Sequence, residues 1–306
     1  MKYRFIKEHY REYPVSLLCK MLEVKRAGYY KWQKSRTTGR RIADMKLLIL
    51  IKHYHYKSKG RYGLRQIHHC LLKAGIMVNR KKVYRIMRSN GIYSVTKRKF
   101  KVTTKHNAKG IYAENLLKGK FEAEGPKKIW TSDITYIWIS EGWLYLAVVL
   151  DIYTRRIVGW SISERITADI VTAALGMAIR HQNPPEGLIF HSDRGSQYRS
   201  EKVKSLLAAN HFKQSMSSTG NCYDNAITES FFSTLKKELV YQRKFYTRSQ
   251  ARTEIFEYIE IFYNRMRQHS SLGYLSPYEF EMKNLSDNKK EEIILINNRR
   301  VAYLGV

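Results

Sequence analysis

Cysteine is scarce in this sequence, and the three that occur, Cys19, Cys70 and Cys222, lie far apart. An odd number of distant cysteines gives no disulfide framework, and the sequence has no Cys-x-x-Cys pair of the kind that binds metals. A run of about 18 uncharged apolar residues, long enough to span a membrane, is also missing. Residues 3–13 are charged throughout and lack the apolar centre of a secretion signal. We therefore expect a protein of the reducing cytoplasm.

Acidic residues are scarce in one region only. Residues 1–120 hold 32 of the 56 Lys and Arg but only 5 of the 26 Asp and Glu, so they carry a net charge of +27. Residues 121–306 carry the remaining +3. A basic region of this kind, in a chain with 23 tyrosines, indicates a polyanionic partner, above all nucleic acid. A generic basic protein, such as a ribosomal one, would not explain the nearly neutral second region.

The basic region contains two candidate helix-turn-helix segments. In residues 14–33, two short helices are separated by a turn at Glu23-Val24, and the second helix would carry the cations Lys25 and Arg26. An ordinary pair of antiparallel helices is the alternative.

The second segment has helices expected at 42–56, 64–74 and 80–90. Asn79 is a good N-cap for the last helix, and Gly91 fits the position just past its end. That helix is the better candidate for DNA contact because of its five cations, although a basic helix face is often merely solvated. The cations are Arg80, Lys81, Lys82, Arg85 and Arg88.

Residues 94–125 are polar and basic and indicate a linker that follows the DNA backbone. The chain after the linker predicts an α/β domain. Three strands joined by short turns form an antiparallel meander, and helices and strands then alternate. The expected elements are strands 128–139, 143–153 and 156–163, helix 168–182, strand 188–191, helix 202–210, strand 212–216, and helices 223–241 and 249–268. This order predicts an RNase H-like fold with a mixed five-stranded sheet and accompanying helices.

Three acidic residues stand in different settings within this domain. Asp133 lies on the first strand, Asp193 follows the fourth, and Glu229 lies on a helix, with 35 residues between Asp193 and Glu229. Carboxylates at strand ends and on a helix can converge outside a sheet, where they repel one another unless a cation is present. Hard oxygen ligands suit Mg²⁺ or Mn²⁺, and two ions about 3.5–4 Å apart can clamp the reacting oxygens of a phosphoryl transfer. The alternative is that each is a surface or capping acid.

Two further charged residues accompany the trio. Lys236 lies seven residues after Glu229, on the same helix face, where it could hold the DNA backbone; a simple surface lysine is the alternative. Asp151 competes for a metal role, but we interpret it as a turn or ion-pair residue beside Arg155 and Arg156.

The segments around the three acids carry a family resemblance. They read Trp-Thr-Ser-Asp-Ile-Thr-Tyr-Ile (130–137), His-Ser-Asp-Arg-Gly-Ser-Gln-Tyr (191–198) and Asn-Ala-Ile-Thr-Glu-Ser-Phe-Phe-Ser-Thr-Leu-Lys (225–236). They resemble the DDE transposases of bacterial insertion sequences. The closest resemblance is to the second-frame (OrfB) protein of the insertion sequence 3 family, whose core is similar to retroviral integrases. The spacing of the second and third acids is that of this group, and the resemblance extends to about residue 282.

The resemblance implies an enzyme that nicks DNA and transfers strands, with Asp133, Asp193 and Glu229 as catalytic residues and as ligands of two Mg²⁺ or Mn²⁺ ions. It implies the terminal inverted repeats and target DNA as substrates, a homo-oligomer on DNA, and an upstream first-frame protein joined by frameshifting. The chain would act on the bacterial nucleoid. Residues 264–277 resemble the family tail, which would close the catalytic domain and touch DNA.

The predicted domains are a helix-turn-helix at 1–36, a second at 37–93, the basic linker at 94–125, and the integrase-like core with its C-terminal helix at 126–282. The tail at 283–306 receives no assignment. Three alternatives stay open: a nuclease of the same fold without strand transfer, a DNA-binding regulator with an inert core, and a structural packaging protein.

Overall fold

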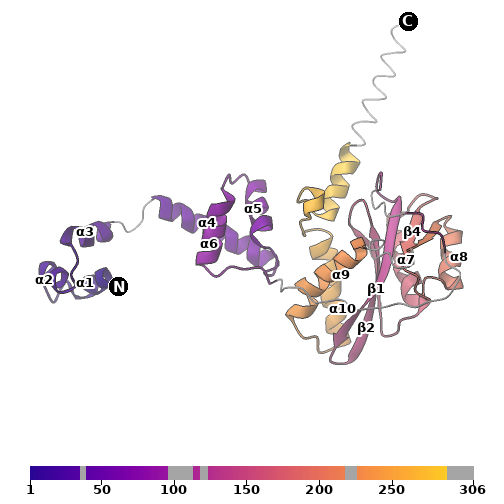
Figure 1. Cartoon of the computed structure of the whole chain (residues 1–306), viewed down its shortest axis with the longest axis horizontal. Helices are drawn as coiled ribbons and strands as arrows, with labels where there is room; N and C mark the ends of the chain where they lie inside the picture. The colour runs from indigo at the N-terminus through magenta and orange to yellow at the C-terminus, as the bar shows by residue number, and fades with distance from the viewer. Residues whose placement is uncertain (35–38, 96–112, 118–122, 218–225, 288–306) are drawn as a thin grey trace, which may run out of the picture. The chain divides into compact units, whose positions relative to one another are not determined.

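The computed structural model of the chain describes residues 1–34, 39–95, 113–117, 123–217 and 226–287 (Figure 1). It forms two compact units, Met1–Tyr93 and Ser94–Val306. The first unit is helical, and the second contains the β-sheet. Among the residues described, no helix is both long and apolar enough to cross a lipid bilayer.

The first group of helices comprises α1 (Lys2–His9), α2 (Val15–Met21) and α3 (Arg26–Lys34). They share a small core in which Ile6 and Tyr29 are fully buried. The helices α2 and α3 are the pair expected from the sequence. Helix α1 was not predicted from the sequence. Only Ile6 on it is buried, and Tyr3 packs partly against the same core, so its sequence carries little apolar pattern.

The second group comprises α4 (Gly39–Lys57), α5 (Leu64–Lys73) and α6 (Arg80–Ser89), as predicted within a few residues. The side chain of Asn79 accepts a hydrogen bond from the backbone N–H of Lys81 at 2.8 Å, which confirms the predicted cap. Gly91 adopts a φ of 64°, the left-handed conformation that favours glycine after a helix. The buried side of α6 leaves its cations on the outer face.

The second unit is built on a five-stranded sheet with the order β3-β2-β1-β4-β5. Strands β1, β2 and β3 are antiparallel neighbours, whereas β4 and β5 run parallel to β1. The strands are β1 (Ile129–Ile139), β2 (Gly142–Asp151), β3 (Ile157–Ser163), β4 (Ile189–Ser192) and β5 (Lys213–Met216). The predicted mixed sheet is therefore confirmed.

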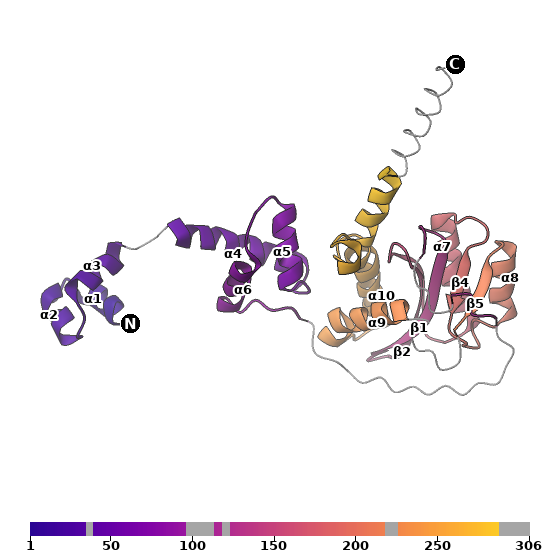
Figure 2. The ribbon, with the colours of Figure 1, turned by 45° about the horizontal axis from the view of Figure 1, so that its top comes forward.

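Helices cover both faces of this sheet. Helices α7 (Ala168–Gln182) and α8 (Glu201–Ala209) lie on one side, and α9 (Ala226–Glu238) and α10 (Arg248–Phe256) lie on the other (Figure 2). Successive residues of a strand point to opposite faces. Trp130 thus enters the main core with α7 and α8, while its neighbour Thr131 contacts α9.

The C-terminal segment is anchored by buried polar contacts. After α10, residues Glu257–Tyr263 form a π-helix, where the sequence predicted one continuous α-helix. The side chain of Asn264 makes two hydrogen bonds of 3.0 Å with the backbone of Ile157 on β3. Arg267 forms an ion pair of 2.9 Å with Glu238 at the end of α9. The tail thus packs on the catalytic domain through Asn264 and Arg267, and the expected contact of the tail with DNA stays a prediction.

Part of the predicted linker belongs to the sheet unit. The backbone N–H of Leu116 donates to the hydroxyl of Ser215 at 3.0 Å, and Leu117 is buried. Residues 113–117 thus pack beside β5. Residues 96–112 and 118–122 of the predicted linker lie outside the described residues.

Gly159 allows α7 to pack closely on β3. A Cβ atom at this position would lie 2.2 Å from the backbone oxygen of Ala174. We expect Gly159→Ala to lower the free energy of unfolding by about 1–3 kcal/mol, because neither backbone can move freely in a packed interior. Urea denaturation followed by circular dichroism would measure the change.

Gly176→Ala is the matched control, since Gly176 lies on α7, the helix that packs on Gly159 of β3. Its added Cβ would meet only the flexible end of Arg180, at 3.3 Å, and alanine favours the helix by up to about 1 kcal/mol. Equal destabilisation by both substitutions would refute the close-packing argument.

Candidate active site

The register of β1 and β4 brings two of the predicted acids together. The parallel pairing ends with Thr131 opposite His191 and Ser132 opposite Ser192. Asp133 and Asp193 are the next residue on each chain. Neighbouring strands lie about 4.8 Å apart. The two aspartates therefore lie side by side where the pairing of β1 with β4 ends.

A buried contact of the neighbouring residue holds Glu229 of α9 near the two aspartates. Thr228, directly before Glu229, donates its hydroxyl to the hydroxyl of Thr131 at 2.7 Å. Both threonines are almost fully buried. Since Thr131 lies two residues before Asp133, this hydrogen bond fixes the first turns of α9 against the strand that carries the first acid.

Local backbone contacts orient the two aspartates. Asp193 accepts a hydrogen bond from the N–H of Gly195 at 3.0 Å, and Asp133 accepts one from the N–H of Ile134 at 2.7 Å. A Cβ at Gly195 would approach the Asp193 carboxylate to 2.9 Å. Gly195, two residues after Asp193, therefore leaves room for the Asp193 side chain to turn back toward the backbone.

The acids act on each other electrostatically. The pKa of Asp133 is raised to about 8, first by burial and then by the charge of Asp193, with a smaller contribution from Glu229. The hydrogen bond from Ile134 and the charge of Lys236 act in the opposite direction. Asp133 therefore retains its proton near neutral pH unless a cation is close to it.

This arrangement fits a divalent cation in kind. The carboxylate oxygens are hard ligands, and a bound cation would stabilise the ionised form of Asp133. However, among the residues that the structure describes, no three His, Cys, Asp or Glu side chains lie close enough together to hold an ion as they stand. Residues 218–225, which lead into α9 and Glu229, are outside the described ranges.

Asp151 has a structural role instead. It is buried and its oxygens accept hydrogen bonds from three backbone N–H groups and from the Trp130 indole, at 2.7–3.2 Å. The prediction of a turn residue is thus confirmed. Of the two arginines considered as ion-pair partners, Arg156 pairs with Glu281. The backbone N–H of Arg155 donates to the backbone oxygen of Asp151 at 2.9 Å.

Comparison with known proteins identifies the family. Residues 123–222 and 229–285 match Integrase core domain families, and residues 43–100 match an HTH-like domain. The transposase InsF for insertion sequence IS3A of Escherichia coli (strain K12) is 41% identical over 94% of this chain and 100% of its own length. An insertion element IS600 31 kDa protein of Shigella sonnei is 42% identical over 87% of this chain and 98% of its own.

The chain belongs to the transposases of the insertion sequence 3 family. The predicted family is thereby confirmed, and with it the enzyme class, a polynucleotidyl transferase with an HTH-like DNA-binding region. Among solved structures, the HTLV-2 integrase catalytic core domain in complex with magnesium aligns with a TM-score of 0.41 and 16% identity, over 52% of this chain and 99% of that one.

Lys236 of the transposase lies near Asp133, the first of the three acids. Its ammonium group lies 4.8 Å from the centre of the Tyr136 ring, and its charge lowers the pKa of Asp133. Burial in turn lowers the pKa of Lys236, while Asp133 raises it. The lysine therefore joins the site to the β1–β2 hairpin.

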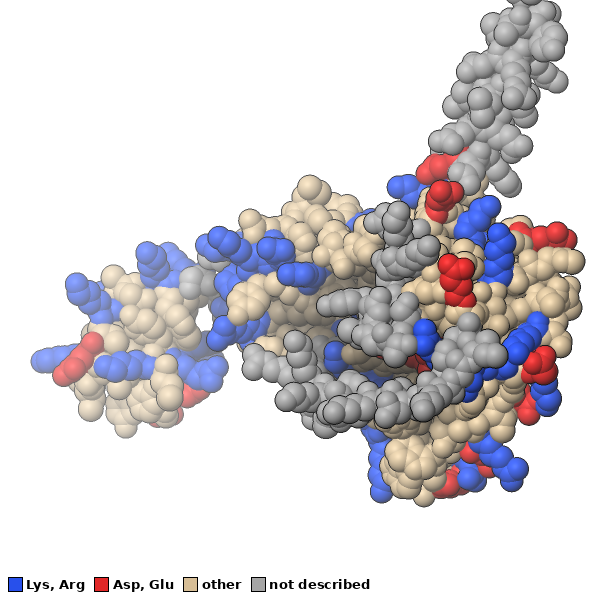
Figure 3. Space-filling model, turned by 45° about the vertical axis from the view of Figure 1, so that its right-hand side comes forward, with Lys and Arg blue, Asp and Glu red and all other residues tan. Residues whose placement is uncertain are grey.

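The basic helices of the transposase divide into engaged and exposed cations. Lys82 and Arg85 form ion pairs with Asp44 of α4 at 2.9 and 2.6 Å, and Arg88 donates to the hydroxyl of Tyr84. The remaining predicted contacts are exposed: Arg80 and Lys81 on α6, and Lys25 and Arg26 at the start of α3. Figure 3 shows many Lys and Arg and few acids on the visible face of the helical unit.

Sequence reasoning missed the buried hydroxyl pairs behind the acids. Besides Thr131 and Thr228, Ser132 shares a hydrogen bond of 3.0 Å with the hydroxyl of Tyr198, which is fully buried. All four residues lie within the quoted motifs or directly beside the acids. No residue pattern indicates which hydroxyls meet, because these contacts join segments distant in the chain.

The threonine pair allows a double-mutant test. We expect Thr228→Val to cost about 1–3 kcal/mol of unfolding free energy, since it leaves the Thr131 hydroxyl buried without this partner. The double variant Thr131→Val with Thr228→Val removes both groups and should recover most of that loss. Urea denaturation of the parent, of the single variants Thr131→Val and Thr228→Val, and of the double variant gives the coupling energy. Strictly additive effects would mean that the hydrogen bond does not stabilise the fold.

Asp133 predicts a pH dependence of the metal-free protein. A carboxyl with a raised folded-state pKa contributes full stability below its unfolded value and loses it as the pH rises to about 8. Asp133→Asn should therefore stabilise the protein near pH 8 by at least about 1 kcal/mol, one pKa unit being worth about 1.4 kcal/mol. Near pH 4 the gain should disappear.

Denaturation in a chelator at both pH values measures this difference. Asp169→Asn, which alters an exposed acid on α7 paired with Lys202, is the control for general charge effects. A gain from Asp133→Asn that stays the same at both pH values would contradict the assigned cause.

Proposed function

We propose that this transposase nicks DNA at the ends of a bacterial insertion sequence and joins the released ends to target DNA in the cytoplasm. Asp133, Asp193 and Glu229 are the proposed catalytic residues. The observation that supports this proposal best is the shared end of β1 and β4, where the two aspartates lie side by side and the charge of Glu229 acts on Asp133.

We propose that Asp133 and Asp193 share two Mg²⁺ or Mn²⁺ ions and that Glu229 completes the ligand shell of one. When bound, such ions stabilise charge on the attacking and leaving oxygens of a phosphoryl transfer. The raised pKa of Asp133 supports this assignment, since the carboxyl becomes fully ionised at neutral pH only beside added positive charge. The hydrogen bonds from Gly195 and Ile134 keep both aspartates oriented.

The protein residues hold and orient the DNA. The attacking groups are water for nicking and a DNA 3′-hydroxyl for joining, so no side chain needs to form a covalent bond. Lys236 is placed to contact the backbone phosphate next to the acids. Its partial burial limits its motion, which makes it a fixed point of positive charge beside the scissile strand.

DNA recognition is proposed for the helical unit. The exposed cations Arg80 and Lys81 of α6, and Lys25 and Arg26 of α3, would contact the terminal repeats. Arg88 and the ion-paired Lys82 and Arg85 would need to release or share their present partners. We further propose a homo-oligomer on DNA and a frameshift fusion with an upstream first-frame protein, as the family membership suggests.

Strand transfer with labelled terminal-repeat DNA and Mg²⁺ tests the proposal. The repeats are read from the DNA that flanks the gene. We expect Asp133→Asn, Asp193→Asn and Glu229→Gln each to reduce joined products by at least about 100-fold, the effect of losing one group that stabilises transition-state charge. Asp169→Asn, on the exposed surface of α7, should retain the activity of the parent.

The outcomes separate the alternatives. Nicked products without joining would support the nuclease, and binding without any reaction would call for the fused protein with its upstream frame. Joining that survives all three substitutions would rule out these acids as the catalytic set.

A further inference from the structure

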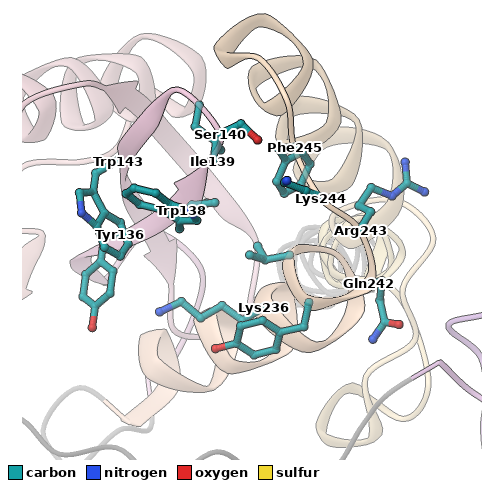
Figure 4. Close-up of a pocket in the computed structure, with 13 residues that line it drawn as sticks. Tyr136, Trp138, Ile139, Ser140, Trp143, Lys236, Gln242, Arg243, Lys244 and Phe245 are labelled. Carbon is teal, nitrogen blue, oxygen red and sulfur yellow. The ribbon is translucent and has the colours of Figure 1, made fainter.

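A groove of about 530 Å³ lies between the β1–β2 hairpin and the segment that follows α9 (Figure 4). Tyr136 and Trp138 of β1 and Trp143 of β2 line one side. Residues 242–245 line the other side, and Lys236 extends from α9 toward Tyr136. We call this the aromatic groove. Its volume falls in the range of about 300–1,000 Å³ that is usual for ligand sites.

The groove lies where β1 extends beyond the end of its parallel neighbour β4. β4 pairs with β1 only as far as Ser132, whereas β2 pairs with it as far as Ile139. Residues 133–139 thus leave one edge of β1 without a neighbouring strand. The backbone N–H of Ser140 donates to the oxygen of Phe245 at 3.0 Å, which fastens the tip of the hairpin to the opposite wall.

The aromatic side chains in the groove are unusually exposed. Tyr136, Trp138 and Trp143 are 57%, 59% and 46% exposed. They contact one another edge to face, with ring centres 5.3 Å apart for Tyr136 and Trp143 and 4.8 Å apart for Trp138 and Trp143. A cluster of large exposed rings on a folded domain generally marks a binding surface.

The charge of the lining favours an anionic ligand. It includes the cations Lys236, Arg243 and Lys244 and no Asp or Glu. Arg243 is paired with Glu254 just outside the lining, which leaves the two lysines as the main charges directed at a ligand. Rings that stack on bases, together with cations that meet phosphates, are the combination used to bind single-stranded nucleic acid.

The aromatic groove adjoins the proposed catalytic acids. Lys236 lies over the Tyr136 ring, and its charge also acts on Asp133 three residues earlier on β1. The rings of Tyr136 and Trp138 point to the face of β1 opposite to Asp133, since side chains alternate along a strand. A strand whose phosphate lies at the acids could therefore reach these rings by passing Lys236 at the edge of β1 that lacks a neighbouring strand. Paired bases hide their faces within the duplex, so only unpaired bases can stack there.

We propose that the aromatic groove binds unpaired nucleotides of the DNA strand next to the scissile phosphate. This inference rests on the proposed function, since it defines a subsite of the same DNA substrate. Trp138 and Trp143 supply the stacking surface, and Lys236 and Lys244 neutralise the phosphates. The groove thereby holds the end of the strand open at the reacting position.

Binding of a labelled thymidine oligomer of about 12 nucleotides to the full chain tests the groove, with blunt duplex as the comparison. We expect Trp138→Ala to weaken oligomer binding about 10-fold, the usual effect of losing one stacked base, and to leave duplex binding unchanged. Trp138→Phe should retain most of the affinity. A fluorescent base analogue within the oligomer should be quenched by the parent and much less by the alanine variant.

Phe256→Ala is the matched control, because Phe256 is a similarly exposed ring (49%) on α10 outside the groove. It should bind the oligomer as the parent does. Thermal melting of each variant checks that folding is intact. Equal oligomer affinity of Trp138→Ala and the parent overturns the proposal. The proposal is also overturned if Trp138→Ala loses self-association or binding to another protein while its DNA affinity is unchanged, since the groove would then be a protein interface.

The test separates the groove from the catalytic proposal. Asp193→Asn should lose strand transfer, and in this background Trp138→Ala should still weaken oligomer binding about 10-fold. If strand transfer fails to depend on the acids but Trp138→Ala still weakens oligomer binding, the catalytic assignment fails and the groove stands. The reverse pattern removes the groove and leaves the catalytic residues in place.

Discussion

Everything in the sheet unit depends on the parallel pairing of β1 with β4. This pairing joins segments about sixty residues apart, and it ends at Ser132 and Ser192 on the two strands. A slip of one residue would point Asp133 or Asp193 to the other face of the sheet, because side chains alternate along a strand. The buried rings of Trp130 and Phe190, side by side in the main core, hold the register against such a slip.

The same arrangement brings like charges together in a partly buried place. Burial, and after it the charge of Asp193, raises the pKa of Asp133. In the absence of a cation, this costs stability at neutral pH, and the cost is recovered when positive charge enters the site. A buried carboxyl whose pKa is raised by a neighbouring acid destabilises the fold at neutral pH, and such groups are often found at functional sites.

Buried polar contacts hold the helix that carries the third acid. The Thr131–Thr228 hydrogen bond fixes the first turns of α9 to β1, and the Glu238–Arg267 ion pair fixes its last turn to the C-terminal segment. Asn264 then ties that segment to β3. Glu229 is thus positioned from both ends of its helix. The aromatic groove lies just beyond, where β1 continues past the end of β4 and residues 242–245 follow α9.

The sequence by itself determined the elements and the chemistry of this protein. Short turns between successive segments indicated the antiparallel strands, Asn79 and Gly91 marked the ends of α6, and the segments around Asp133, Asp193 and Glu229 indicated the family. Local patterns carry such information because strand alternation, capping and turn formation involve residues close in the chain.

Only the tertiary structure decided which groups meet. It paired Lys82 and Arg85 with Asp44, paired Arg267 with Glu238, and joined Thr131 to Thr228. It also gathered Trp138 and Lys236 around one groove. These contacts depend on strand register and helix packing over long separations, and a single sequence contains no pattern that states which distant side chains come within hydrogen-bonding distance.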